Sequence, residues 1–343
     1  MANSFFKTLT SADRTQSRTL LHENIPITGT LLSGTYNTAA SGREVNVKTF
    51  SHGMFQSVYD YPYASSSANH ILDLSAGFST NASSLSSSAT SQASKKVNIY
   101  NQMAQVLVGY DTGSNVRNFD QDGNLTAGTK HHNAVFINFS RLLTKDEIKK
   151  GSFSMIIGTG SSYSTPFSNT ATISDTGAAT SYLSNSPAGE YGLLKNGSTN
   201  VGLIYYQAGI AVLTSSVFNN SSEMNSSAHT MEGLMTGSSI DVVSDAMRHR
   251  IQNISFNNTT ELNSTIFFCR ANHNEFNYSS NPTYLSGSKI IVKDDEPLNL
   301  PRAYVTTVGL YSPDNELMAV AKVSEPLRKD PTNELTLRVR LDY

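Results

Sequence analysis

The chain has 343 residues, enough to bury a substantial core and, at roughly 150 residues per domain, to form about two domains or one large one. Charged residues make up 15% of it, against roughly 25% in an average soluble protein, and Ser, Thr and Asn take their place. The net charge of −2 gives no basic surface for nucleic acid, and the one cysteine, Cys269, excludes an internal disulfide and a cysteine-based zinc site.

The compartment of synthesis is expected to be a reducing cytoplasm. The first residues lack a charged leader followed by a sustained apolar run, so we expect no signal peptide. No stretch of the sequence approaches the length and hydropathy of a membrane span. We therefore expect neither a membrane nor a nucleic acid as a partner.

The N-terminal part of the sequence is irregular. Residues 1–50 mix polar side chains with short apolar runs such as residues 25–32, which predicts an extended arm with one or two strands. Arms of this kind often reach onto a neighbouring subunit. Residues 65–94 are rich in Ser and Ala, which bury little apolar area, and they predict a flexible loop that packs only around residues 68–74.

Three segments have helical signals. Residues 97–108 place apolar side chains at helical spacing on one face, and Gly109 is a plausible stop. Residues 240–251 carry a similar stripe, with acidic charge early and arginines late, an order that suits the helix dipole. Residues 144–147 match a capping box and predict a very short helix with its exit at Gly151.

Strand patterns dominate from Ser152 onward. The expected strands are residues 153–157, 171–173, 202–206 and 210–213, the last two joined as a hairpin. No fixed-period repeat occurs, which argues against a propeller, a solenoid or a repetitive fibre shaft.

The last forty residues give the clearest pattern. Residues 303–311 and 316–323 flank the turn 312–315 and predict a β-hairpin, and another strand follows Pro326. Over 335–343 apolar and polar residues alternate with period two, as in a half-buried strand. Chain ends usually fray unless a sheet holds them, so we expect a built-in C-terminus at an edge that meets more protein.

Together these elements predict a mainly β fold with a few helices, of the α+β class, with antiparallel sheets or a sandwich and a long N-terminal arm. We expect an extended arm over 1–50 and a mixed segment over 51–135 that carries the Ser-rich loop and one amphipathic helix. A β-rich domain with C-terminal strands would cover 136–343.

Several short motifs have features of chemical sites. Residues 118–124 resemble the start of a calcium loop, but position twelve is Thr129 where a Glu is needed, so an Asx-rich turn is favoured. The adjacent His131 and His132 would point to opposite faces of an extended segment, so the two side chains cannot easily bind one metal ion together. Cys269 and His273 are close in sequence, but a buried, inert cysteine on a strand is favoured.

Two further motifs have simpler explanations than a ligand site. Residues 158–162 are glycine-rich, yet neither a Walker lysine nor a dinucleotide fingerprint follows, so a tight turn is favoured. The tyrosines of residues 59–63 fit packing or a subunit interface better than stacking on a sugar. We therefore predict no catalytic, cofactor-binding or metal-binding residue, and no cofactor.

A resemblance to a known family rests on residues 57–69, 98–105, 140–154, 274–284 and 304–343. Taken together, these stretches resemble virion structural proteins of contractile-tailed marine bacteriophages. Residues 201–214 also resemble a hairpin of phage tail-associated proteins. The resemblance spans most of the chain from about residue 50 onward and brings no catalytic residues with it.

The resemblance implies a non-enzymatic structural subunit of a phage tail or baseplate, assembled in the host cytoplasm and located in the virion. Its partners would be other phage structural proteins and further copies of itself in a symmetric homo-oligomer or multi-copy assembly. Three alternatives stay open. They are a receptor-binding or fibre-attachment tail protein, a neck or head-surface component, and a tail-associated glycan hydrolase with two carboxylates across a cleft.

Overall fold

The structure, a computed structural model, describes residues 6–25, 44–85, 90–143, 146–278, 285–286, 289–290 and 300–343. The fold is mainly β with large antiparallel sheets, as predicted, with 42% of the described residues in strands and 16% in helices, the short 3-10 helices included. The three α-helices of the described residues are α1 (Ser91–Leu107), α2 (Met231–Gly237) and α3 (Ile240–Arg250). None of them is long and apolar enough to cross a membrane.

The described residues also form eighteen strands and four short 3-10 helices. The strands are β1 (Arg14–Ile25), β2 (Val47–Thr49), β3 (Gln56–Tyr59), β4 (His70–Phe78), β5 (Asn133–Asn138), β6 (Glu147–Ile148), β7 (Ser154–Gly158), β8 (Thr170–Ser174), β9 (Leu183–Ser186), β10 (Gly189–Asn196), β11 (Thr199–Tyr205), β12 (Ile210–Thr214), β13 (Ile251–Ala271), β14 (Leu285–Ser286), β15 (Lys289–Ile290), β16 (Ala303–Tyr311), β17 (Leu317–Lys329) and β18 (Leu335–Asp342). The 3-10 helices are η1 (Ser11–Asp13), η2 (Ser140–Leu142), η3 (Pro166–Ser168) and η4 (Ser215–Phe218).

The chain forms two compact units, and their boundaries differ from the expected division. The central unit is Leu20–Glu261, and the terminal unit combines Met1–Thr19 with Leu262–Tyr343. The expected boundary near residue 135 falls inside β5. That strand pairs with β4 on one side and β12 on the other, so no division of the chain is possible there.

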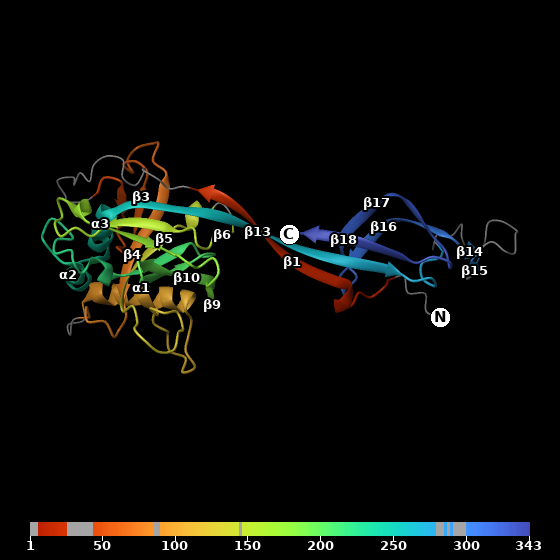
Figure 1. The fold of residues 1–343 in the computed structure, drawn as a ribbon, viewed down its shortest axis with the longest axis horizontal. Coiled ribbons are helices and arrows are strands. Elements are labelled where there is room, and N and C mark those ends of the chain that lie inside the picture. The colour runs from red at the N-terminus through yellow and green to blue at the C-terminus, as the bar shows by residue number, and fades with distance from the viewer. Residues whose placement is uncertain are drawn as a thin grey trace. The chain divides into compact units, whose positions relative to one another are not determined.

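The central unit is built on one antiparallel sheet (Figure 1). Its strand order is β13-β7-β8-β10-β11-β12-β5-β4-β3-β2, with β6 paired to β13 and β9 paired to β10. The predicted hairpin is β11 with β12, where Tyr205 lies opposite Ile210.

Both faces of the central part of this sheet are covered. Along β5, Val135 and Ile137 belong to the core cluster that holds α2 and α3. Ala134 and Phe136 belong to the other cluster, which holds most of the buried face of α1. The apolar runs of β5, β11 and β12 are therefore continuous because each strand is buried on both sides.

Helix α1 lies directly against β4. It starts six residues earlier than predicted, since the side chain of Thr90 accepts a hydrogen bond from the amide of Ala93 and caps the helix. Gly77 of β4 allows the close contact, because a Cβ atom there would stand 2.6 Å from the carbonyl oxygen of Lys96 and 2.9 Å from the amide nitrogen of Tyr100.

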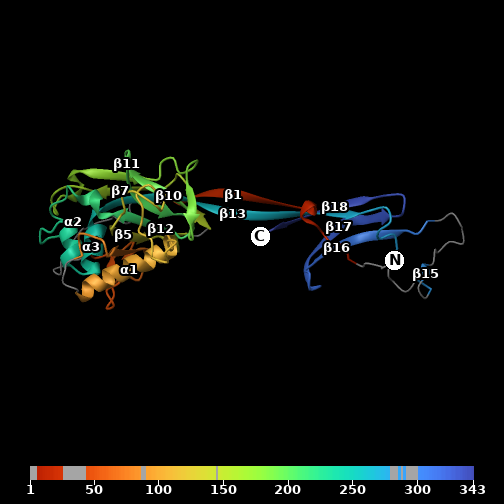
Figure 2. The same cartoon turned by 90° about the horizontal axis from the view of Figure 1, so that it is seen from below.

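In the terminal unit, β18 pairs with β13, and β16 pairs with β17 in a separate two-stranded sheet. Figure 2 shows β16, β17 and β18 together in this unit. The predicted hairpin and the predicted C-terminal strand are both confirmed, with Val339 opposite Phe267 and Tyr311 opposite Leu317. β17 continues past Pro326 to Lys329. Pro326 lies where the register of the two strands is irregular, between the residues opposite Val305 and Thr307, so the sheet needs no amide hydrogen from it.

Two local predictions fail for the same physical reason. Thr144 and Lys145 of the expected short helix lie outside the described residues, but Glu147 and Ile148 form β6 and pair with β13 instead of continuing a helix. Within the expected flexible loop 65–94, the packing predicted around residues 68–74 is confirmed by β4, but this strand continues to Phe78 with buried residues and α1 already begins at Ser91. Residues 86–89 of that loop are outside the described part. In both places tertiary pairing overrides the local signal.

The segment 1–50, expected as an extended arm, has strands at both of its described ends. β1 pairs with β13 and β2 pairs with β3, so both strands belong to a sheet, and residues 26–43 lie outside the described residues. Residues 14–21 of β1 are exposed along their whole length.

Candidate functional site

The aspartate-rich segment 118–124 forms a turn held by a buried ion pair. The carboxylate of Asp120 is fully buried, pairs with Lys130 at 2.9 Å and accepts a hydrogen bond from the amide of Leu125. Asp122 accepts hydrogen bonds from the backbone and side chain of Asn124. Among the residues that the structure describes, no group of three His, Cys, Asp or Glu side chains has the geometry to hold a metal ion.

The two adjacent histidines have separate environments. His131 is buried, and burial lowers the pKa of its imidazole to about 4. His132 is half-buried and lies 2.7 Å from the hydroxyl of Ser79 through its Nδ1 atom. The structure therefore does not bring the two rings to one shared ligand position.

The glycine-rich loop after β7 is fastened through its carbonyl groups. Arg250 donates from Nη1 to the carbonyl oxygens of Gly158 at 3.1 Å and Gly160 at 2.8 Å. The amide of Gly160 donates to Pro166, and that of Thr159 to Asn169. A phosphate loop needs free amide groups that point to the ligand, and these amides are already used.

The cysteine and histidine of the C-terminal region have separate neighbours. Cys269 is half-buried on β13 opposite Leu337, and burial raises the pKa of its thiol. The side chain of His273 is two-thirds exposed and lies 3.5 Å from Glu334. The thiol is thus held in its less reactive protonated form.

The tyrosine cluster leaves two aromatic rings at the surface. Tyr61 is 53% exposed and Tyr63 is 49% exposed. The Tyr63 ring lies 6.3 Å from that of Tyr59, and Tyr59 packs edge-on against His70. These two exposed rings are compatible with the receptor-binding alternative as well as with a subunit interface.

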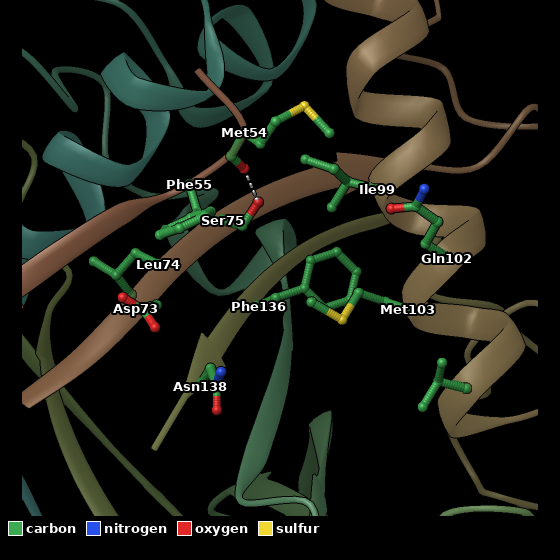
Figure 3. A pocket seen from close by; sticks show the side chains of 11 residues that line it. Met54, Phe55, Asp73, Leu74, Ser75, Ile99, Gln102, Met103, Phe136 and Asn138 are labelled. Atoms are coloured by element: carbon green, nitrogen blue, oxygen red, sulfur yellow. Dashed lines mark hydrogen bonds between the residues drawn. The ribbon is translucent and has the colours of Figure 1, made fainter. Parts of the chain in front are cut away.

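An apolar groove of about 490 Å³ lies between α1, the segment just before β3 and the strands β4 and β5 (Figure 3). Figure 3 shows Ile99, Gln102 and Met103 of α1 on one side of it and Phe136 and Ser75 of the strands on the other. Its lining residues are Met54, Phe55, Asp73, Leu74, Ser75, Ile99, Gln102, Met103, Val106, Phe136 and Asn138.

The carboxylate and the hydroxyl group that line this groove are already paired. Asp73 is the one carboxylate in its lining, and it lies 2.6 Å from the hydroxyl of Ser57 and 2.7 Å from Nε2 of His70. Ser75 donates to the carbonyl oxygen of Met54 at 2.6 Å, as Figure 3 shows. A glycoside-hydrolysing pair needs two carboxylates across a cleft, and this groove supplies one.

The terminal unit has a different character, because its apolar residues are exposed. Of the sixteen large apolar side chains exposed in the described residues, nine lie in this unit. We call these nine the terminal apolar surface. They are Phe6, Phe276, Leu300, Tyr304, Tyr311, Leu317, Met318, Val320 and Tyr343.

The same unit has almost no core of its own within the described residues. Of the 50 buried apolar residues there, 49 lie in the central unit, and Val339 is the exception. Neither of the two core clusters includes a residue of the terminal unit. Burial of apolar side chains, which normally stabilises a small domain, therefore contributes little to the stability of the terminal unit in a single chain.

The sequence indicated this surface only in part. The alternation over 335–343 predicted β18, but not that Val339 would be the one buried apolar residue of the unit. A further signal was the nearly uninterrupted apolar run of residues 317–323, which puts apolar side chains on both faces of a strand.

The chain was compared with models of protein families, with curated proteins and with solved structures, and none of the three comparisons found a match.

Proposed function

We propose that this chain is a non-enzymatic structural subunit of a bacteriophage virion, in the tail or baseplate, and that it acts through assembly contacts. The resemblance of the sequence to virion structural proteins supplies the type of particle. The single observation that carries the assembly role is the terminal unit, which exposes apolar side chains and contains one buried apolar residue in its described part.

The physical argument starts from what strands require. A two-stranded sheet is at best marginally stable in water, and β16 with β17 is such a sheet among the described residues. Large exposed apolar patches mark interaction surfaces, and the obligate interfaces of assemblies commonly exceed about 2,000 Å². The terminal apolar surface would be buried when subunits assemble, and no cofactor takes part.

Purified particles of the phage that encodes this chain provide the test. Quantitative mass spectrometry is expected to find the wild-type chain in several copies per particle. Truncation before Leu335, which removes β18, is expected to abolish its incorporation or folding, because β13 loses its partner over eight residue pairs.

The control for the truncation is Arg338→Ala, which changes an exposed side chain of β18 and keeps the strand. This variant is expected to enter particles at the wild-type level. Wild-type particles without the chain, or normal particles built with the truncated chain, contradict the proposed function.

A further inference from the structure

The β16–β17 hairpin has an exposed apolar cluster on one face. Tyr311 lies opposite Leu317, and Gly309 lies opposite Val320. A Cβ atom on Gly309 would stand 2.9 Å from the Tyr311 ring and 3.3 Å from a Leu317 methyl group, so both side chains extend over this glycine. Tyr311, Leu317 and Val320 are 47%, 52% and 52% exposed.

The opposite face of the hairpin is apolar too. Leu310 lies opposite Ala319, and Val308 lies opposite Ala321. All four residues are half-buried. A strand pair with apolar residues on both faces is typical of strands that are covered on both sides.

Within a single chain the described residues provide little of this cover. The ring of Phe6 packs edge-on against Tyr311 at 5.0 Å, but Phe6 is itself 53% exposed. The outer edges of β16 and β17 have no strand partner among the described residues. Long exposed edges beside apolar faces are ready to pair with another chain.

The charge of this region suits association of identical chains. Residues 300–343 contain six Lys or Arg and six Asp or Glu side chains, so the segment is neutral. Two identical segments without net charge do not repel one another. A strongly charged partner would gain no electrostatic attraction from this segment. A second copy is also present wherever the chain is made, and an apolar hairpin needs its cover as soon as it forms.

The surface also supplies apolar area for an interface. Five of its nine exposed side chains are aromatic, and an aromatic side chain buries about 150–250 Å² in full, so these half-exposed rings alone offer several hundred Å² per chain. A stable interface takes roughly 800 Å² from each partner, including its polar rim.

We propose that the β16–β17 hairpin is an interface between copies of this chain, with Tyr311, Leu317 and Val320 at its centre. The proposal rests on the proposed function, since it names a second copy as the first partner of the assembly unit. It requires a symmetric homo-oligomer to form in solution before any other partner is added.

Sedimentation equilibrium of the full-length chain tests this directly. At micromolar concentration the wild-type chain is expected to have a mass at least twice the 37.2 kDa of one chain. The double variant Leu317→Lys with Val320→Lys is expected to sediment at 37.2 kDa, since it places two charges in the interface. The control Val106→Lys changes an apolar residue of α1 that is 64% exposed and is expected to keep the wild-type mass.

Amide hydrogen exchange of the wild-type chain provides a second measurement that needs no variant. The amides of β16 and β17 are expected to be protected at high protein concentration and to lose protection on dilution. A wild-type mass of 37.2 kDa, an unchanged mass in the double variant, or hairpin exchange that is independent of concentration overturns the proposal.

The outcomes separate this proposal from the proposed function. A homo-oligomer that is missing from purified particles contradicts the virion role and leaves the interface intact. A monomer in solution that is nevertheless found in particles contradicts the hairpin interface and leaves the virion role intact.

Discussion

His131 illustrates how burial fixes the behaviour of one residue. Its side chain is 4% exposed, and this burial lowers the pKa of the imidazole to about 4, although the nearby Asp120 carboxylate acts in the opposite direction. In an unfolded chain a histidine has a pKa of about 6.5. Between these values the unfolded chain holds a proton that the folded chain lacks, so the free energy of unfolding falls as the pH drops.

The variant His131→Gln tests this coupling. The difference of about 2.5 pK units between the folded and unfolded chain corresponds to about 3 kcal/mol of stability, which the wild type loses between pH 6.5 and pH 4. The variant lacks this imidazole and is expected not to show this loss. Urea unfolding at several pH values measures it. His229→Gln, at an exposed histidine, is the control and is expected to follow the wild type. Parallel pH profiles for wild type and His131→Gln would refute the coupling.

Arg250 shows what a residue pattern does not reveal. The sequence places Arg248 and Arg250 at the C-terminal end of a helix, where positive charge suits the dipole, and the helix is confirmed as α3. Both arginines are nevertheless buried. Arg250 donates to the carbonyl oxygens of Gly158 at the end of β7, of Gly160 and of Glu223, which are 27 to 92 residues away in the sequence, so this role depends on tertiary structure.

At the scale of elements, the contact between α1 and β4 depends on a residue without a side chain. The substitution Gly77→Ala is expected to reduce the free energy of unfolding by roughly 1–3 kcal/mol, because the new Cβ atom meets backbone atoms that cannot rotate away. Thermal or urea unfolding measures the change.

Gly237→Ala is the matched control for this substitution. Gly237 ends α2, and a Cβ atom there would have no atom within 4 Å. The control is expected to change the free energy of unfolding by no more than about 0.5 kcal/mol. Equal effects of the two substitutions would show that α1 does not pack on β4 as closely as the structure indicates.

The sequence predicted elements well where one periodic pattern decided them. Helix α3, the β11–β12 hairpin, the β16–β17 hairpin and β18 have their predicted type and nearly their predicted bounds, except that β17 continues six residues beyond residue 323. The sequence did not predict burial where the residue type argues against it. Lys96 is a charged residue on the buried face of α1, and it donates to the carbonyl oxygens of Leu234, Met235 and Ser238 at the end of α2.

At the scale of the whole molecule, the two units are stabilised differently. The central unit has a sheet covered on both faces, with nearly all the buried apolar residues of the described chain. The terminal unit keeps its apolar residues at the surface, so its stability is expected to come mainly from other protein. The built-in C-terminal strand could be predicted from its alternation, but the lack of a core around it could not, because burial depends on the folded chain.

The central claim is that the terminal unit completes its apolar packing only inside an assembly. A cryo-electron microscopy map of the intact phage particle tests it most directly. The account predicts several copies of the chain in the tail or baseplate, with Tyr311, Leu317 and Val320 covered by neighbouring protein. A particle without the chain, or copies in which these three side chains face solvent, would contradict the account.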